Sequence, residues 1–371
     1  MVLSWGDDYP IHQTPEPIAY AGTDRNFYDR YFFNGYAPHG DEARADRMFA
    51  AAFGVYPHLN IADASFVIVR DGVETALHAS KWLNMERMDL QVGPIRIEIV
   101  EPLRVLKLSI DAPVDGIKAE LTFTGRSAPI EEPRFMRRIG PRAFMDYTRL
   151  TQNGRYTGWI ELDGKREPID GFVGTRDRSW GVRPIGARDP QEPVPPQPQQ
   201  FFWLWAPCNF PDGSFFFHSN DDAAGLPWNR RAVWAPDDGA AIDYAAVSSE
   251  VTWARGTRHA AAATVRIGDP DSGAQAIRFE PRQKFFMLGL GYTHPKWGHG
   301  LSHGSLSIER EDFTLSEIDV RQPHFLHIQA LSTVTFVDAA GREVKGRGVL
   351  EQLVLGPHAP SGFKSTLDLA P

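Results

Sequence analysis

Apolar and polar residues alternate with a period of two through much of the chain after about residue 60. The segments Ile95–Ile99 and Ile117–Thr124 each place an apolar residue at every second position, with charged residues or threonine between. Side chains alternate across a β-strand, so this pattern is typical of strands that bury one face and expose the other. Several such strands are predicted.

Turn residues join these strands into hairpins. Asp71-Gly72 lies between the apolar runs Phe66–Val69 and Val73–Leu77, and Asp163-Gly164 separates two further strand-like segments. Asp-Gly between two such runs is typical of a tight hairpin turn. The pattern therefore predicts an antiparallel all-β protein.

Helical periodicity is confined to the N-terminal part. Between Asp41 and Phe53, alanines, Met48 and Phe49 recur at mixed spacings of three and four, and Gly54 stands where a helix could end. We expect one or two short helices here and none elsewhere.

A proline-rich stretch near the middle suggests a connection between domains. Pro190–Pro198 contains five prolines, which cannot form a central strand and are typical of an extended connector. A chain of 371 residues is also long for one core. We therefore predict two β domains, 1–190 and 191–371, each a barrel or sandwich.

Composition narrows the partners. Aromatic residues make up 12% of the chain, including ten Trp and 23 Phe, which predicts a large apolar pocket or unusually thick cores. The net charge is −8 and no run of Lys or Arg exceeds two residues, so we expect no nucleic-acid partner.

The N-terminus lacks the basic start and apolar core of a signal peptide, and no stretch approaches the roughly eighteen apolar residues of a membrane span. A cytoplasmic protein without an integral membrane segment is expected. Cys208 is the single cysteine and stands among aromatic residues, which favours a buried, inert thiol over a nucleophile.

The segment Gly174–Arg183 gathers Arg176, Arg178 and Arg183 around Asp177 and Trp180. On a strand, Arg176, Arg178 and Trp180 would share one face and Asp177 the other. Such a segment is either a functional site or a buried Arg–Asp pair that holds a strand in place.

A second polar segment, Gly289–Gly304, holds three histidines, Tyr292 and Trp297 among five glycines. His294, His299 and His303 could ligate a metal in principle, but the glycines oppose the helix that would bring His299 and His303 together. Acid–base or substrate-anchoring histidines are the functional interpretation, and structural histidines are the alternative. No metal or other cofactor is predicted.

We expect no hydrolase, nucleotide-binding or zinc-protease function, because we identify no nucleophile elbow, Walker loop, dinucleotide fingerprint or H-E-x-x-H in the chain. Asp177, Arg178, Ser179, Trp180 and Gly181, near the middle of the chain, resemble an element of the AttH-like and carotenoid 1,2-hydratase superfamily. That resemblance implies two packed lipocalin-like β-barrels with an apolar cavity, and hydratase or ring-closing activity. Arg176 and Arg183 add charge that a hydrocarbon would not require, so a substrate carrying a hydroxyl, phenol or carboxylate is expected.

Together these observations predict a lyase, hydratase or isomerase that acts by acid–base chemistry on a bulky apolar molecule, such as a terpenoid, steroid or lignin-type aromatic, in a cavity between the two domains. Asp177 is the expected acid or base, and a nearby guanidinium would make it a base or a structural residue. The other expected catalytic residues are His294, His299, His303 and Tyr292; the expected substrate-binding residues are Arg176, Trp180, Arg183, Trp203, Trp205 and Trp297.

Two alternatives stay open. The first is a non-catalytic lipocalin-like carrier of a hydrophobic small molecule, in which the aromatics line a pocket. The second is a β-rich scaffold with no ligand, in which Asp177 and the arginines form an ion-pair cluster. A homodimer is compatible with either alternative and with the enzyme.

Overall fold

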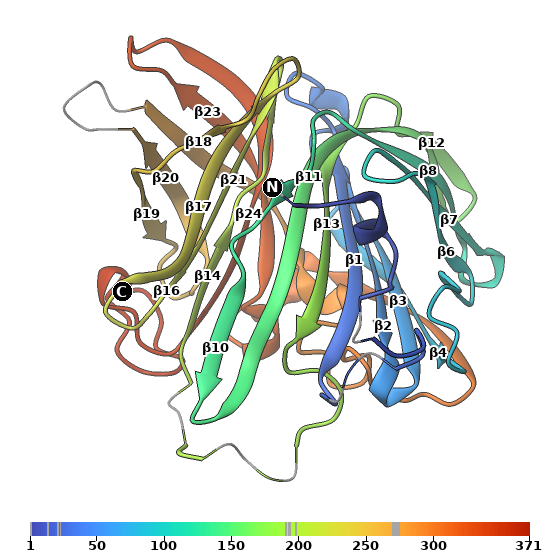
Figure 1. The fold of residues 1–371 in the computed structure, drawn as a ribbon. Helices are drawn as coiled ribbons and strands as arrows, with labels where there is room; N and C mark the ends of the chain where they lie inside the picture. Colours follow the sequence, from blue (N-terminus) through green and yellow to red (C-terminus); the bar gives the residue numbers. More distant parts are fainter. Residues whose placement is uncertain are drawn as a thin grey trace. The chain divides into compact units, whose positions relative to one another are not determined.

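The computed structural model describes residues 2–12, 15–20, 22, 24–189, 191, 194–196, 199–268 and 275–371. Within these residues the regular structure is antiparallel β-sheet with short 3-10 turns and no α-helix, which confirms the all-β prediction (Figure 1). The chain forms two compact units, each built on one sheet: unit 1 comprises Met1–Tyr36, Arg47–Gln197 and Leu288–Thr314, and unit 2 comprises Ala37–Asp46, Pro198–Met287 and Leu315–Pro371.

Unit 1 contains a sheet that curls until its ends approach each other, as in a lipocalin-like barrel. Near its two ends, Gly93 lies against Ile308. The strands in sheet order are β22 (Leu306–Thr314), β4 (Val73–Trp82), β3 (Ile61–Arg70), β2 (Met48–Tyr56), β1 (Phe27–Tyr36), β13 (Val173–Val182), β11 (Arg142–Leu162), β8 (Ile117–Gly125), β7 (Val105–Ala112), β6 (Ile95–Glu101) and β5 (Gln91–Val92), with β9 (Ile130–Glu131), β10 (Phe135–Ile139) and β12 (Lys165–Pro168) beside β11.

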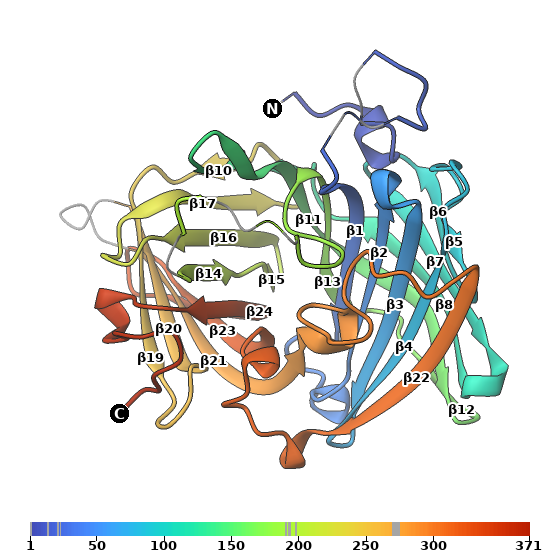
Figure 2. The ribbon, with the colours of Figure 1, turned by 90° about the horizontal axis from the view of Figure 1, so that it is seen from below.

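Unit 2 contains the second sheet, whose strands are labelled in Figure 2 except for β18, which is labelled in Figure 1. Its strands in order are β18 (Ile242–Asp243), β17 (Pro227–Pro236), β16 (Gly213–Asp221), β14 (Phe201–Trp205), β24 (Glu343–Leu355), β23 (Ile328–Val337), β21 (Gln275–Phe286), β20 (Ala260–Ile267) and β19 (Val247–Trp253), with β15 (Cys208–Phe210) between β16 and β24. Cys208 is fully buried, and burial raises the pKa of its thiol well above the usual value. This agrees with the inert thiol expected from its neighbours.

Single 3-10 turns are the helical elements of the described residues. They are η1 (Trp5–Asp8), η2 (Glu42–Arg44), η3 (Pro57–Leu59), η4 (Pro113–Asp115), η6 (Met287–Leu290), η7 (Leu315–Glu317), η8 (Pro323–Phe325) and η9 (Ala359–Ser361). None of the described helical segments has the length and apolar character needed to cross a membrane.

The α-helix expected between Asp41 and Phe53 is wrong. The 3-10 turn η2 occupies Glu42–Arg44, and the chain from Met48 onward is strand β2. Every residue of β2 is buried, because the strand is covered on both faces. A continuous apolar run has no period of two, and such a run cannot be distinguished from a buried helix by its pattern.

The predicted hairpins are confirmed where the turn residues stand. Asp71 and Gly72 join β3 to β4 with φ angles of 53° and 77°, and Asp163 and Gly164 join β11 to β12 with 51° and 76°. Two successive positive φ angles give a turn whose twist matches that of the strands, and Asp-Gly tolerates them. The division at residues 190 and 191 stays a prediction, and part of the expected connector Pro190–Pro198 lies outside the described residues.

Part of the aromatic excess fills the core of unit 1. Phe49 packs edge-on against Tyr156 with ring centroids 4.9 Å apart, and Phe33 meets Phe123 at 6.3 Å. These four rings are fully buried. Packing of the core of unit 1 therefore accounts for part of the aromatic content.

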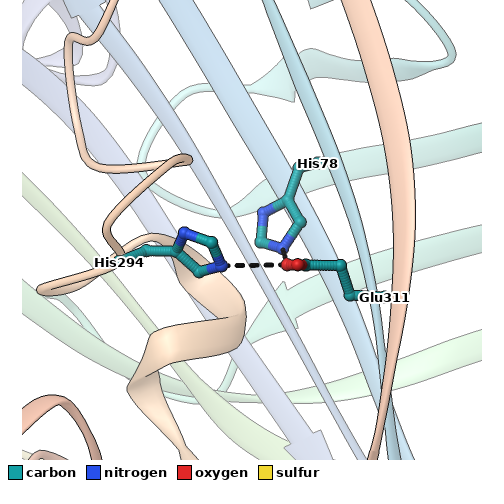
Figure 3. A group of neighbouring side chains, drawn as sticks. All are labelled: His78, His294 and Glu311. Atoms are coloured by element: carbon teal, nitrogen blue, oxygen red, sulfur yellow. Dashed lines mark hydrogen bonds and ion pairs between the residues drawn. The ribbon is translucent and has the colours of Figure 1, made fainter.

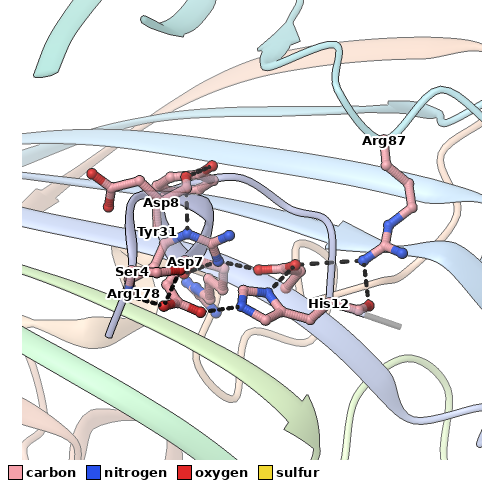
Figure 4. A network of polar contacts seen from close by, with 9 residues as sticks. Ser4, Asp7, Asp8, His12, Tyr31, Arg87 and Arg178 are labelled. Atoms are coloured by element: carbon pink, nitrogen blue, oxygen red, sulfur yellow. Dashed lines mark hydrogen bonds and ion pairs between the residues drawn. The ribbon is translucent and has the colours of Figure 1, made fainter. Parts of the chain in front are cut away.

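A buried ionic network ties the N-terminal segment to the centre of the first sheet (Figure 4). Asp8 binds Arg176 through its side chain at 2.6 Å, and Asp29 pairs with Arg178. All four side chains are fully buried. The carboxylate of Asp29 also lies 3.4 Å from the buried guanidinium of Arg87. An unpaired charge at this depth would destabilise the fold by several kcal/mol. The segment that carries Asp8 therefore makes it possible to bury Arg176 on β13.

We expect Asp29→Asn to lower the free energy of unfolding at pH 7 by about 3–5 kcal/mol, because it leaves a buried guanidinium unneutralised. Burial raises the pKa of Asp29, but Arg178 and His12 outweigh it and the net pKa is lowered. The carboxylate therefore stabilises the fold above its unfolded pKa of about 4, and this contribution disappears as pH falls through the lower folded pKa.

Urea denaturation between pH 2 and 7 tests this expectation. Glu101→Gln is the control, because its pair with Arg104 is more than half exposed on both sides and should change stability by less than about 0.5 kcal/mol. Equal losses in the two variants, or a loss in Asp29→Asn that does not decrease as pH falls below about 4, would contradict the assignment.

Candidate functional site

Strand β13 places the Gly174–Arg183 segment between β1 and β11, and the expected division of the segment into two faces is confirmed. Arg178 pairs with Asp29 in the ionic network of Figure 4, and Arg176 pairs with Asp8. Trp180 lies on the same face, where its ring stacks on His12 with centroids 3.8 Å apart. Each side chain is thus engaged within unit 1, and the substrate-binding roles predicted for Arg176 and Trp180 stay predictions.

Asp177 faces the other way, toward Arg149. Its Oδ2 lies 3.9 Å from Arg149 Nη1, and the Asp177 side chain is 12% exposed. Arg149 also donates to both oxygens of Glu132 at 2.9 and 3.0 Å. Burial lowers the pKa of Arg149, but these two carboxylates outweigh it and the net pKa is raised. Asp177 therefore shares a permanent cation with a second carboxylate, and its catalytic role stays a prediction.

The second polar segment folds within unit 1 against β1, β3 and β4. Its glycines allow this close approach. Gly291 has a φ of +88°, and a Cβ there would lie 2.6 Å from the carbonyl oxygen of Trp297. Gly300 has a φ of +74° and donates its N–H to Asp63 on β3 at 2.8 Å. Glycine is needed at both positions, which explains why a segment with few packing side chains is rich in glycine.

A small pocket, here called the Asp63 pocket, opens between these strands and the segment. Asp63, Ser65, Ala79 and Ser80 come from β3 and β4. The segment contributes the remaining lining residues, which are Leu290, Trp297, Gly298, His299, Leu301 and His303. The structure thus brings three predicted site residues, His299, His303 and Trp297, to one pocket.

Asp63 is the acid of this pocket. Tyr56 Oη donates to its Oδ1 at 3.0 Å and the Gly300 N–H donates to its Oδ2. Burial raises the pKa of Asp63 to about 6, although Arg30 acts in the opposite direction. A carboxyl group with a pKa near neutrality can exist in both protonation states under ordinary conditions, which is what a proton carrier requires.

His299 has a proton position fixed by its partners. Its Nε2 lies 2.9 Å from the carbonyl oxygen of Leu290, which can only accept, so Nε2 carries the hydrogen. Arg30 Nη1 lies 2.6 Å from each ring nitrogen, and since a guanidinium can only donate, it pairs with Nδ1. Arg183 also approaches Nδ1, at 3.5 Å. Two cations therefore face the one lone pair, so the geometry favours a positioning role for His299 over proton transfer.

Tyr292 and Arg183 lie beside this histidine. The Tyr292 ring meets His299 edge-on with centroids 4.5 Å apart. The guanidinium of Arg30 lies 4.8 Å from the Tyr292 centroid, and that of Arg183 lies 5.7 Å from it. Cation–π contacts of this kind hold the ring and the arginines together. Their predicted catalytic and substrate-binding roles stay predictions.

His303 and Trp297 form another wall of the pocket. Their ring centroids lie 4.3 Å apart, and His303 Nε2 donates to the Lys296 carbonyl at 3.0 Å. Trp297 Nε1 donates to Glu309 at 2.5 Å. The apolar face of the indole is thereby turned toward neighbouring rings rather than water.

His294 lies outside the pocket lining, in a cluster with His78 of β4 and Glu311 of β22 (Figure 3). The three candidate ligand atoms lie within 4.8 Å of one another, close enough to be considered as a metal site. However, the backbone N–H groups of Lys296 and Trp297 donate to His294 Nδ1 at 3.0 and 2.8 Å. The ring proton must then lie on Nε2, which donates to Glu311 at 2.9 Å and has no lone pair for a metal. The arrangement fits a hydrogen-bonded cluster and does not fit a metal centre.

Trp203 and Trp205 belong to strand β14 of unit 2. Trp203 Nε1 donates to Glu351 at 2.8 Å, and His327 and Gln329 contact the same buried carboxylate, each at 2.8 Å. Trp205 is 1% exposed. Both indoles are packed side chains of this unit, and their substrate-binding role stays a prediction.

The residues that sequence reasoning missed are those on strands. Asp63, Ser65 and His78 lie in buried strands among alanines and larger apolar residues. Polar residues are uncommon in such strands, and this is the feature of the sequence that could have identified them as site residues. A further pattern, Gly300-Leu301-Ser302-His303-Gly304, matches the G-x-S-x-G of a nucleophile elbow. The structure shows a loop there with Ser302 exposed and no strand-to-helix turn, so that motif lacks its required context.

Comparison with known proteins agrees with this architecture. An AttH-like protein from Nitrosomonas europaea matches with a TM-score of 0.51 and 13% identity over 89% of this chain and 94% of its own. CghA, solved with Sch210972, matches with a TM-score of 0.52 and 12% identity over 94% of this chain and 96% of its own. Kievitone hydratase from Nectria haematococca gives a TM-score of 0.48 and 10% identity over 93% and 97%.

The first two similarities show that the chain shares the fold of these two proteins, and the resemblance to the AttH-like superfamily agrees with that fold. A family model matches residues 3–364, and the chain belongs to that family, DUF8625, a family of unknown function. No curated protein matches the chain.

The raised pKa of Asp63 has a measurable consequence for stability. The folded carboxyl group binds its proton more tightly than the unfolded one, so the free energy of unfolding falls as pH rises from about 4 through about 6. We expect the difference between wild type and Asp63→Asn to fall by up to about 3 kcal/mol between pH 4 and 7.

Urea denaturation across that pH range measures the difference. Asp71→Asn is a matched control, because the exposed Asp71 has its pKa lowered by Arg47, so its difference should change in the opposite direction. A difference for Asp63→Asn that is independent of pH would show that Asp63 ionises normally.

Proposed function

We propose that this protein is a lyase or hydratase, or a related isomerase, in which Asp63 transfers a proton to and from an apolar substrate. The observation that carries the proposal is the half-buried residue Asp63, which lines a pocket and whose carboxyl group has a pKa of about 6. The resemblance of Asp177–Gly181 to the carotenoid 1,2-hydratase superfamily and the AttH-like fold support the reaction class.

The surroundings of Asp63 suit both halves of a proton transfer. When protonated, it can deliver a proton to an alkene carbon or to a departing hydroxyl group. When ionised, it is stabilised by the Tyr56 hydroxyl and the Gly300 N–H, which both donate to its oxygens. These donors are already in place, so little reorganisation accompanies the reaction.

The pocket is small, so we propose that it receives the reacting group of a larger molecule. Leu290, Leu301 and the ring of Trp297 supply its apolar surface. An aromatic face beside Asp63 would also stabilise positive charge that develops on protonation of an alkene. We retain terpenoids, steroids and lignin-type aromatics as the proposed substrate classes, with a hydroxyl, phenol or carboxylate held by arginine.

Turnover of a mixed apolar extract tests the proposal. The purified protein is incubated with terpenoids, steroids and lignin-derived aromatics, and soluble products and retained compounds are identified by mass spectrometry. We expect wild type to convert one compound with gain or loss of one water or with rearrangement. Asp63→Asn should lower that rate by about 10²–10⁴-fold while retaining the compound.

Asp177→Asn is the matched comparison, because Asp177 is a half-buried carboxylate of the same unit outside the Asp63 pocket. If Asp63 acts as the acid, the wild-type rate falls as pH rises through about 6, since the protonated form disappears. Loss of turnover in Asp177→Asn alone would transfer the role to Asp177. Retention of an unchanged compound by wild type would identify a carrier instead.

A further inference from the structure

A continuous series of polar contacts runs from the Asp63 pocket to the partly exposed carboxylate of Glu311. Ser65, which lines the pocket, has its Oγ 3.1 Å from Nδ1 of His78. His78 Nε2 lies 3.1 Å from Oε2 of Glu311 (Figure 3). Ser65 is 7% exposed and His78 is fully buried. A hydroxyl, an imidazole and a carboxylate in sequence is the arrangement that activates a serine in unrelated enzymes.

The proton positions in this series follow from the partners. His294 donates from Nε2 to Glu311 Oε2 because its Nδ1 is occupied by two backbone N–H groups. His294, which donates to the carboxylate, and His78, whose Nε2 lies 3.1 Å from it, together hold the pKa of Glu311 well below its usual value. Glu311 is therefore ionised and can only accept hydrogen bonds.

The same reasoning extends to His78. A lone pair on its Nε2 would repel the ionised carboxylate 3.1 Å away, so the ring proton lies on Nε2. Burial lowers the pKa of His78 despite this carboxylate, so the ring is neutral at pH 7 and its Nδ1 has a lone pair. Nδ1 accepts from the Ser65 hydroxyl, whose oxygen lone pairs remain for the pocket.

We propose that Ser65 is a nucleophile, activated by His78 and Glu311, and that the chain hydrolyses small esters in addition to the lyase-type reaction. Ser65 Oγ attacks the ester carbonyl while its proton passes to His78 Nδ1, and the imidazolium is stabilised by Glu311. That proton then passes to the departing alkoxide as the carbon–oxygen bond breaks, which leaves an acylated Ser65. Water, deprotonated by the same imidazole, releases the acid and restores the serine.

Asp63 is two residues from Ser65 on β3, so the two side chains share a face and a pocket. As a carboxylic acid, Asp63 can donate a hydrogen bond to the negative oxygen that forms during the attack. An asparagine amide can do the same. The ester reaction therefore does not require residue 63 to carry a proton, unlike the lyase-type reaction.

Ser80 supplies an internal comparison within the same pocket. It is buried, but its Oγ lies 3.4 Å from the carbonyl oxygen of Leu301, which accepts the hydroxyl hydrogen and cannot act as a base. Ser302 is exposed and belongs to the G-x-S-x-G loop. Of these three serines, Ser65 is the one that contacts an imidazole which itself lies against a carboxylate.

Labelling with phenylmethanesulfonyl fluoride tests the proposal, using intact-mass measurement and peptide mapping on the full chain. We expect one equivalent of label on Ser65 in wild type, none in Ser65→Ala, and normal labelling in Ser80→Ala and Ser302→Ala. Glu311→Gln should label at least about tenfold more slowly, because the imidazolium loses its counter-charge. Label on Ser80 or Ser302, or no label on Ser65, would overturn the proposal.

The dependence of labelling rate on pH separates activation by His78 from unaided attack. With a neutral imidazole as base, the rate is level above pH 7, whereas an unassisted hydroxyl would gain roughly tenfold per pH unit as it ionises. Release of p-nitrophenol from p-nitrophenyl acetate, with a burst equal to the enzyme concentration, is expected in wild type and absent in Ser65→Ala.

Glu311→Gln distinguishes failure of this proposal from failure of the proposed function. Glu311 lies outside the lining of the Asp63 pocket, so this variant should slow labelling of Ser65 while lyase-type turnover stays within a few fold of wild type. Folding of every variant is checked by its thermal transition. Unchanged labelling in folded Glu311→Gln would overturn this proposal, whereas a wild type that labels at Ser65 but converts no apolar compound would overturn only the proposed function.

Discussion

The ion pair between Asp29 and Arg178 joins β1 to β13 at the centre of the first sheet. It is fully buried and is continued by Asp8 and Arg176, so four charges are withdrawn from water together. Charges at this depth are tolerated only when each has a partner. The N-terminal segment is therefore needed to neutralise Arg176, because the carboxylate that pairs with it, Asp8, comes from η1.

On the other face of these strands, arginines also need partners, but those partners are not carboxylates alone. There the partners of Arg30 and Arg183 include a neutral imidazole and the ring of Tyr292. These groups accept hydrogen bonds or cation–π contacts without cancelling the charge. Positive charge therefore persists beside Asp63, and it limits how far burial alone raises the pKa of that carboxyl group.

The pattern of apolar and polar residues predicted the strands that have one face exposed to water. The alternation in Ile95–Glu101 and Ile117–Gly125 appears directly as alternating burial. It failed for Met48–Tyr56, because a strand covered on both faces has no period to read. The candidate site was predicted only in part. The glycines and histidines of residues 289–304 form a polar loop that is easy to recognise in the sequence, whereas Asp63 and Ser65 are isolated polar residues in a mostly apolar strand. Their partners, Gly300 and His78, are brought to them by chain folding that local spacing does not encode.

Two carboxylates in this region show how environment divides their roles. Glu311 accepts a hydrogen bond from His294 and lies 3.1 Å from Nε2 of His78, and these two contacts lower its pKa and keep it an acceptor. Asp63 receives hydrogen bonds too, but burial is the larger effect and raises its pKa to about 6. Titratable groups whose environments separate their pKa values are suited to opposite roles in acid–base chemistry. Ser65 contacts His78, which lies against Glu311, and it shares a strand face with Asp63. The serine is therefore placed between a carboxylate that only accepts hydrogen bonds and a carboxyl group that can gain or lose a proton.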